Sequence, residues 1–284
     1  MKKRISLLIS FLLGVGSYAL YQNLFTPCHP FPNIKNKYNY PALLTAKMEW
    51  EKHKAIGKPL PIGEPPKTLI LCYDETFLKD VLQKYPTEQC SVGIYRFNDY
   101  PSIAIGYFGL FGPTNAFKLE RAMAWGIKQV IAIGSSAGLQ KDIVPGDIIV
   151  CEKSLRDEGT SHHYLPYSKF VYPSEILQKK VLHYLQIRNI AYRLGPSWTT
   201  DAFYRTTKEE VEQYQKEGIL TVEGEIAALF AVSAYNNIDA VALLTITDSF
   251  ANLKWEKSTM YKEKKRETLY TLLTIALKVG TEKE

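Results

Sequence analysis

The sequence predicts an α/β fold in which helices cover both faces of a β-sheet. Segments typical of strands and segments typical of helices alternate from about residue 68 onward. Several strand segments, such as residues 68–73 and 240–247, are continuous apolar runs, as expected where both faces of a strand are buried. The chain has 284 residues, of which 46% are hydrophobic and 23% charged, so its composition is that of a globular protein and not of a disordered one.

These patterns place the elements along the chain. Strands are expected at residues 68–73, 91–97, 102–108, 130–135, 147–151, 192–198, 220–222 and 240–247. Helices are expected at residues 78–84, 115–126, 175–187, 209–217, 225–235 and 258–279. We therefore expect residues 67–284 to form the folded domain. Residues 26–66, which are rich in proline, asparagine and lysine, are expected to be largely extended, with a short helical patch at 41–54.

The first 25 residues have the pattern of a signal peptide or a membrane anchor. Basic residues 2–4 precede an apolar run at residues 5–21, and the small residues Ser17 and Ala19 are spaced as at a signal cleavage site. The apolar run is at the short end of the length that spans a bilayer. We expect an exported or membrane-anchored protein in which segment 1–25 is either cleaved or retained. The alternative is a buried N-terminal helix of a cytoplasmic protein.

Charge and cysteine content exclude several classes of partner. The formal net charge is +6, and residues 2–4 carry three of those charges, so the rest of the chain is too mildly basic to indicate a nucleic-acid partner. The cysteines at positions 28, 72, 90 and 151 are too far apart for a zinc motif or a CxxC redox motif. We expect no metal site and no cofactor.

The first candidate binding motif is GSSAG at residues 134–138, directly after an apolar strand. Small residues at a strand end let backbone N–H groups approach an anion, and the hydroxyls of Ser135 and Ser136 add donors next to Gly134. The alternative is an ordinary tight turn.

Carboxylates follow two other strands. Glu223 and Glu225 lie where a strand ends and an apolar helix starts, and paired carboxylates can accept hydrogen bonds from the vicinal hydroxyls of a ribose. For Glu225 the alternative is a favourable interaction with the helix dipole. Asp248 ends the apolar strand ALLTIT, where α/β sheets place their ligands, although a helix N-cap is an equal alternative.

Two further segments carry side chains that could bind a substrate. RDEGTSHHYLP, residues 156–166, concentrates charges and hydroxyls after a strand, and its adjacent His162 and His163 cannot face one metal ion together. Phe203 lies in WTTDAFY, at a strand end, and could stack on a base or pack in the core.

Together these segments resemble the nucleoside phosphorylase family, which contains bacterial purine nucleoside phosphorylase, uridine phosphorylase and methylthioadenosine nucleosidase. The resemblance covers about residues 67–280 and rests on five motifs in family order: GSSAGL (134–139), RDEGTSHHYLP (156–166), TTDAFYR (199–205), VEGEIAALFAV (222–232) and LLTITDS (243–249). It implies a mixed central β-sheet, partly barrel-like and flanked by helices. It also implies a homo-oligomer, a dimer, trimer or hexamer, with sites near the subunit contacts.

The resemblance further implies a reaction in which phosphate cleaves the N-glycosidic bond of a nucleoside. Residues Gly134, Ser135 and Ser136 would bind the phosphate co-substrate, with Arg156 as a candidate cation. The ribose hydroxyls would be bound by Glu225 and Glu223. On the base, Phe203 would pack against the ring and Asp248 would be the general acid at N7, which favours purines.

Three departures from the family pattern keep other functions open. Ala132 stands where the enteric-type phosphorylases have an arginine, and no arginine follows the first strand. Gly224 stands where a methionine usually packs against the sugar, so we expect room for a larger ligand or weaker sugar binding. The alternatives are a nucleosidase that uses water in place of phosphate and an exported nucleoside-binding or storage protein on the same fold.

Overall fold

The structure, a computed structural model, describes residues 31–34, 36–257 and 261–281. The export or anchor segment expected at residues 1–25 lies outside this range. In the part of the chain that is described, no helix is both long and apolar enough to cross a bilayer. The chain divides into two compact units, residues 1–37 and 38–284, and the second unit contains the whole β-sheet.

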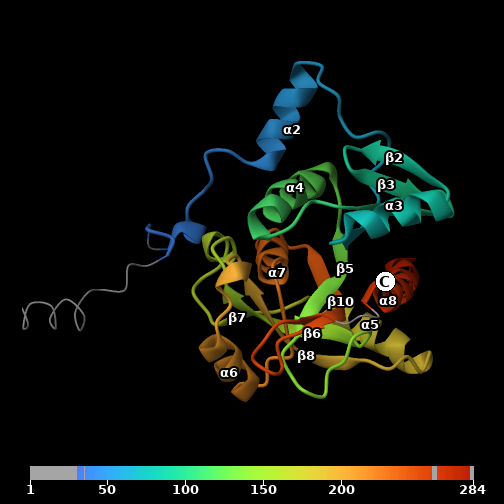
Figure 1. Cartoon of the computed structure of the whole chain (residues 1–284). Coiled ribbons are helices and arrows are strands. Elements are labelled where there is room, and N and C mark those ends of the chain that lie inside the picture. Colours follow the sequence, from blue (N-terminus) through green and yellow to red (C-terminus); the bar gives the residue numbers. More distant parts are fainter. Residues whose placement is uncertain (1–30, 35, 258–260, 282–284) are drawn as a thin grey trace, which may run out of the picture. The chain divides into compact units, whose positions relative to one another are not determined.

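Helices and strands follow one another along the chain, and most helices lie between strands (Figure 1). The helices are α2 (Ala46–Ala55), α3 (Glu75–Lys84), α4 (Gly112–Trp125), α5 (Glu175–Ile187), α6 (Lys208–Lys216), α7 (Ile226–Tyr235) and α8 (Tyr261–Thr281), with short 3₁₀ turns η1 (Lys37–Asn39), η2 (Ser161–His163) and η3 (Phe203–Arg205). The strands are β1 (Thr68–Cys72), β2 (Thr87–Ser91), β3 (Ile94–Phe97), β4 (Tyr100–Gly106), β5 (Gln129–Gly138), β6 (Ile148–Asp157), β7 (Phe170–Val171), β8 (Arg193–Thr200), β9 (Thr221–Glu223), β10 (Asp239–Ser249) and β11 (Glu256–Lys257).

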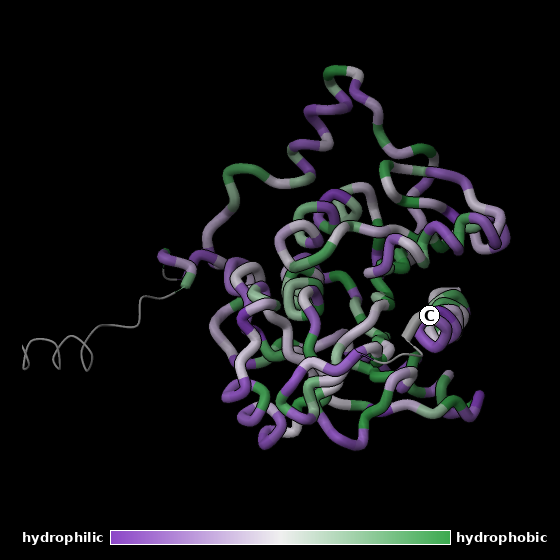
Figure 2. Tube along the Cα trace, in the orientation of Figure 1, coloured by the Kyte–Doolittle hydropathy of each residue, from purple (hydrophilic) through white to green (hydrophobic). Residues whose placement is uncertain are grey.

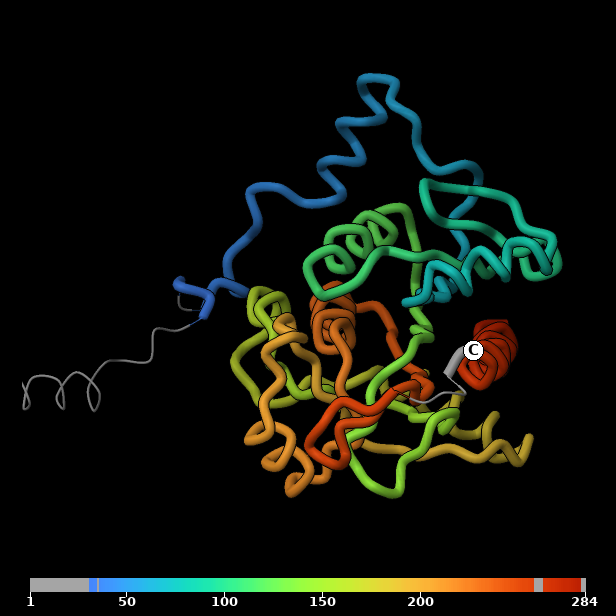
Figure 3. The backbone as a smooth tube through the Cα atoms, viewed as in Figure 1, coloured from blue at the N-terminus to red at the C-terminus, as the bar shows by residue number. Residues whose placement is uncertain are grey.

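Part of the sheet closes into a barrel, which confirms the predicted fold class. Strands β5, β10, β6, β8 and β9 form a closed ring of hydrogen-bonded neighbours, because β5 pairs with both β10 and β9. The remaining order β5-β1-β4-β3-β2 is an open extension with parallel and antiparallel pairs. Strand β5 therefore belongs to the open sheet and to the barrel, and it runs through the middle of the molecule (Figure 3).

Helices cover both faces of the sheet, as the alternating pattern predicts. Helices α4 and α7 pack on one face, where Leu119 and Phe230 join one apolar cluster. Helices α3, α5 and α8 pack on the other, where Leu177 and Leu272 join a second cluster. Each fully buried side chain of this kind contributes about 1.5–3 kcal/mol. Hydrophobic residues gather on the central strands and hydrophilic ones on the outer helices and loops (Figure 2).

Several strands are longer than the apolar runs that predicted them. The GSSAG segment, expected as an anion-binding motif at the end of a strand over residues 130–135, forms the second half of β5, and β6 continues through Arg156 to Asp157. Closure of the barrel explains the difference, because residues such as Ala137 and Gly138 gain ladder partners on β9 as well as on β10. The short strands β2, β7 and β11 were not expected, since β2 and β11 contain few apolar residues and β7 is only two residues long.

The contact between α4 and α7 depends on Gly112, at the start of α4. A Cβ atom at this position would lie 2.9 Å from Cβ of Ala228 and 3.1 Å from Oγ1 of Thr160. We expect Gly112→Ala to destabilise the protein by about 1–3 kcal/mol, because the Cβ atoms of Ala228 and Thr160, at 2.9 and 3.3 Å, cannot rotate away. Denaturant unfolding measures this cost. In a double-mutant cycle with Ala228→Gly the two costs should not add, and additive costs would contradict the proposed contact.

Candidate active site

A break in the pairing of β5 lies at the predicted anion motif. The pairing with β1 ends at Ile133, and the pairing with β9 starts at Ala137. Among the described strands, Gly134, Ser135 and Ser136 therefore have a neighbour only on the β10 side. The carbonyl of Ile133 accepts from the N–H of Tyr73 on the β1 side at 3.0 Å. Because backbone groups alternate along a strand, the N–H of Ser135 points to that same side, into the break.

The ring of Tyr73 packs on Gly134, where an added Cβ would lie 3.1 Å from Cδ2 of the tyrosine. Burial raises the pKa of Tyr73 well above its usual value, and the charges of Glu225 and Glu223 raise it further. The hydroxyls of Tyr73 and Ser136 are buried and have no hydrogen-bond partner within the described part of the chain. Such hydroxyls are uncommon in protein interiors and indicate a place where water or a ligand can bind.

Glu223 is buried and fully engaged by its own chain. Its Oε1 accepts from the hydroxyls of Thr199 at 2.5 Å and Ser197 at 3.1 Å. Its Oε2 accepts from the amides of Glu225 at 2.6 Å and Ile226 at 2.8 Å. The side chain thus joins β8 and β9 to the start of α7, which differs from the ribose-binding role predicted for it. Burial and the charge of Glu225 raise the pKa of Glu223 to about 7, against the opposing hydrogen bonds.

Glu225 is also buried, but its carboxylate keeps free acceptor capacity. Oε1 accepts from the amide of Phe111 at 2.8 Å, and Oε2 accepts from the amide of Gly224 at 3.2 Å. Each oxygen can accept a further hydrogen bond, which is the geometry that vicinal hydroxyls need. Burial raises the pKa of Glu225, and these two amides oppose the rise.

The space expected at Gly224 is filled. A Cβ atom at this glycine would lie 2.8 Å from Cδ1 of Phe111, so the phenyl ring covers the position. The expectation that Gly224 leaves room for a larger ligand is therefore wrong for this structure, because a residue from another loop occupies that room.

Asp248 lies on the other side of β5 from Glu223. In the sheet register, Asp248 pairs with Ala137 on one side of β5, and Val222 pairs with Ala137 on the other. A bulge between Ile246 and Asp248 adds one residue to β10, and bulges commonly re-aim a side chain next to an active site. The Nε1–H of Trp255 donates to Oδ2 of Asp248 at 2.9 Å. The carboxylate is thus held by a side chain and does not cap a helix.

Arg156 is buried and does not lie free beside the break in β5. Its Nε donates to Ser161 Oγ at 2.8 Å, its Nη1 to the carbonyl of Pro166 at 2.7 Å and to Ser168 Oγ at 2.9 Å, and its Nη2 to the carbonyl of Leu165 at 3.3 Å. The guanidinium therefore holds the loop after β6 together, contrary to the phosphate-binding role predicted for it.

Phe203 and the adjacent histidines flank this region. Phe203 is half-buried and opens the turn η3, three residues after the end of β8. His162 Nε2 contacts the carbonyl of Arg156 at 3.3 Å, and its ring stacks on Tyr167. Over the described residues, no group of histidine, cysteine or acidic side chains could hold a metal ion.

A lysine that the sequence patterns do not indicate comes to the end of β1. Lys265 of α8 forms an ion pair with Asp74, with Nζ 2.6 Å from Oδ2. Burial alone would raise the pKa of Asp74, but the hydrogen bonds from Lys265 and from the amide of Phe77 lower it below its usual value. Asp74 follows the end of β1 by two residues, and its Oδ1 accepts from the amide of Phe77 at 2.8 Å at the start of α3, so the ion pair lies beyond the carboxyl end of β1. Only the fold reveals this cation, since α8 is far away in sequence.

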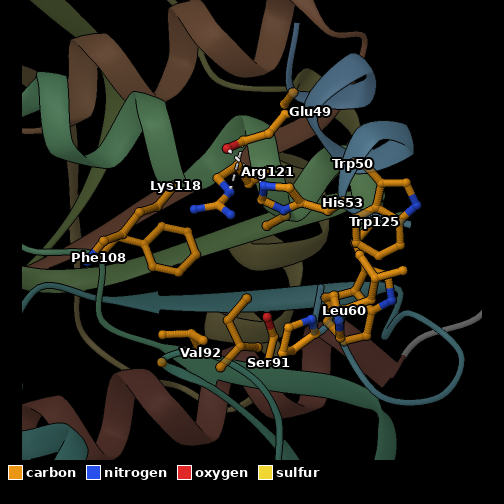
Figure 4. Close-up of a pocket in the computed structure, with 16 residues that line it drawn as sticks. Glu49, Trp50, His53, Leu60, Ser91, Val92, Phe108, Lys118, Arg121 and Trp125 are labelled. Atoms are coloured by element: carbon orange, nitrogen blue, oxygen red, sulfur yellow. Dashed lines mark ion pairs between the residues drawn. The ribbon is translucent and has the colours of Figure 1, made fainter. Parts of the chain in front are cut away.

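A cavity lies outside this site. It has a volume of about 290 Å³ and is bounded by α2, α4 and the hairpin of β2 and β3 (Figure 4). Trp50, Trp125 and Phe108 form apolar walls, and Arg121 and Glu49 form an ion pair at 3.3 Å on one side. None of the predicted site residues lines this cavity.

Comparison with known proteins gives one family match and several relatives. Residues 69–277 match the phosphorylase superfamily. A purine nucleoside phosphorylase DeoD-type from Aliivibrio fischeri is 26% identical over 222 residues, covering 78% of this chain and 92% of that protein. One from a Thermoanaerobacter species is 28% identical over 198 residues, covering 66% and 81%. The crystal structure of uridine phosphorylase from Vibrio fischeri has a TM-score of 0.67 at 23% identity, covering 76% and 92%, and supports the fold.

The buried acid Glu223 should make stability depend on pH. Its pKa rises from an ordinary value of 4.5 to about 7 in the folded chain, so the native state binds the extra proton. Stability is then greatest at pH values below the unfolded-state pKa of Glu223. It falls as pH rises through about 7, by about 1.4 kcal/mol for each unit of pKa shift. Glu223→Gln should flatten this decline, because an amide can donate to the two hydroxyls and accept from the two amides.

Urea unfolding between pH 5 and 8 measures the slope, at about half-unit steps. Glu212→Gln, at an exposed position on α6, is the matched control and should keep the slope of the unmodified protein. An unchanged slope in Glu223→Gln would show that Glu223 stays ionised throughout this range.

Proposed function

This chain belongs to the phosphorylase superfamily, and we propose on that basis that it cleaves the N-glycosidic bond of nucleosides with inorganic phosphate. The products would be a free base and ribose 1-phosphate. The observation that carries the proposal is the break in β5, which is flanked by Glu225 on one side and Asp248 on the other. The break lies beyond the carboxyl end of β1. Ligands of α/β proteins bind at the carboxyl ends of strands, where the strand order changes.

In this proposal phosphate binds in the break. The amide of Ser135 faces the break, the side-chain hydroxyl of Ser136 has no partner among the described residues, and Gly134 adds no side chain. Backbone and hydroxyl donors of this kind bind anions well. As the glycosidic bond breaks, positive charge develops on the ribose, so an adjacent phosphate both stabilises it and supplies the attacking oxygen.

The carboxylates take separate roles. Glu225 accepts hydrogen bonds from the ribose hydroxyls, using the acceptor capacity that its two amide contacts leave. Glu223 holds the start of α7 in place. Phe203 packs on the base, and Asp248 donates a proton to N7 of a purine as negative charge develops on the leaving base. The preference for purines rests on this acid and on the names of the relatives in sequence.

The main difference from the family pattern is that the arginines expected to bind phosphate are missing, so another residue must supply the positive charge. Ala132 has no charge, and the guanidinium of Arg156 donates its hydrogen bonds to residues of its own loop. We propose that Lys265 supplies the positive charge, because the ion pair with Asp74 holds its ammonium beyond the carboxyl end of β1, the strand whose pairing with β5 ends at the break. If Lys265 does not serve phosphate, the second candidate is a nucleosidase that uses water, which the missing arginines favour. Assembly into a homo-oligomer and export through residues 5–21 remain predictions.

The phosphate proposal is tested with the purified chain, inosine, adenosine and uridine, with and without phosphate. Base release should require phosphate. Ser136→Ala, which removes the hydroxyl that has no partner among the described residues, should lower the apparent phosphate affinity about tenfold, the value of one hydrogen bond to a charged group. Lys265→Gln should lower it at least as much, while Lys264→Gln, an exposed neighbour, should not. Base release at the same rate without phosphate would replace the phosphorylase by the nucleosidase.

The role of Asp248 is tested by Asp248→Asn. Asparagine keeps the shape and the contact with Trp255, but it cannot transfer a proton. Purine release should slow by about 10²- to 10⁴-fold, while nucleoside binding changes little. The loss should be much smaller for a 7-methylated purine nucleoside, whose base leaves without protonation. Steady-state rates on both substrates measure the contrast, and equal small losses on the two would remove Asp248 from the chemistry.

A further inference from the structure

Phe111 has a backbone conformation that is rare for a large side chain. Its φ is +67°, in the left-handed region that glycine favours, directly before the first residue of α4. Two glycines allow the close packing around it. Gly112 touches Ala228 of α7, and Gly224 lies under the phenyl ring. Such strained conformations persist where the surroundings fix them, and they concentrate at functional sites.

Phe111 contributes both a polar and an apolar group beside one carboxylate. Its N–H donates to Oε1 of Glu225 at 2.8 Å. Its ring covers Gly224, whose own N–H donates to Oε2 of the same carboxylate at 3.2 Å. The side chain keeps 37% of its surface exposed, so part of the ring is not covered by the chain itself. An exposed aromatic surface next to a buried acceptor suits a ligand with hydroxyls on one edge and carbon–hydrogen groups on its face.

We propose that Phe111 positions the pentose of the substrate. The amide fixes Glu225 for the sugar hydroxyls, and the ring forms the wall against which the carbon face of the sugar packs. This inference rests on the proposed role of Glu225 in binding ribose. The ring takes the place that a side chain at position 224 would otherwise fill, so the wall comes from the loop between β4 and α4.

Phe111→Gly separates the two contributions. Glycine keeps the amide that holds Glu225, and it suits a φ of +67°, so relief of backbone strain offsets part of the packing lost with the ring, and urea unfolding measures the balance. The nucleoside KM should rise about tenfold through loss of the apolar wall. The kcat, the phosphate KM and the affinity for free base should change little. Phe117→Ala removes an exposed phenylalanine from α4, the helix that follows Phe111, and should leave all four quantities unchanged.

A second variant tests whether the ring acts by filling space above the sugar. In the Phe111→Gly background, Gly224→Met places a flexible side chain into the vacated position, and it should restore most of the nucleoside affinity. Gly224→Met alone should weaken nucleoside binding, because its side chain and the ring compete for one space. An unchanged nucleoside KM in Phe111→Gly would overturn the proposal, and so would a failure of the double variant to recover.

Calorimetric titration with inosine and with hypoxanthine keeps this test independent of the reaction. If the unmodified protein binds inosine but cleaves no nucleoside with phosphate, the proposed function fails. The role of Phe111 is then still decided by whether Phe111→Gly weakens inosine binding and spares hypoxanthine. If Phe111→Gly weakens both ligands equally, the ring does not act on the sugar and the inference is wrong.

Discussion

The double use of strand β5 is the constraint on which the rest of the structure depends. Its first half must pair with β1 to build the open sheet, and its last residues must pair with β9 to close the barrel. Strands β1 and β9 pair with the same edge of β5, so they cannot pair with the same residues. A short stretch of β5 therefore remains unpaired on that edge, between the two. Gly134, Ser135 and Ser136 occupy that stretch. The break is a product of the topology, and the small residues there keep it open.

Burial of two acids beside the break follows from the same arrangement. Glu223 joins β8, β9 and α7 through its hydroxyl and amide partners, and Glu225 follows it at the helix start. Together they place two carboxyl groups in a region that contains the buried phenol of Tyr73. Taking such groups out of water is costly, and the hydrogen bonds to each oxygen offset part of that cost. One acid organises the backbone, which leaves the other available to a ligand.

The sequence predicted the elements that have a clear period or a continuous apolar run. Helix α5 lies where it was expected, and the fold class is confirmed, because buried strands and amphipathic helices leave strong local patterns. The lengths of β5, β6 and β10 were less predictable, since ring closure recruits polar residues into strands. The partners of Arg156 and the approach of Lys265 to Asp74 depend on contacts between distant segments, which no local pattern reports. Phe111 was missed because its role requires a glycine more than a hundred residues away.

The extra residue in β10 has a consequence for how the chain tolerates change. A regular ladder would keep the side chains after Ile246 in the alternation that buries Leu244 and Ile246 together on one face. The bulge breaks that alternation just before Asp248. Without the bulge, Thr247 would pair with Ala137 and Asp248 with Gly138, so the Asp248 side chain would face the opposite side of the sheet. A substitution at Thr247 leaves the observed pairing in place, whereas loss of the bulge would turn the Asp248 carboxylate away from the face that it occupies.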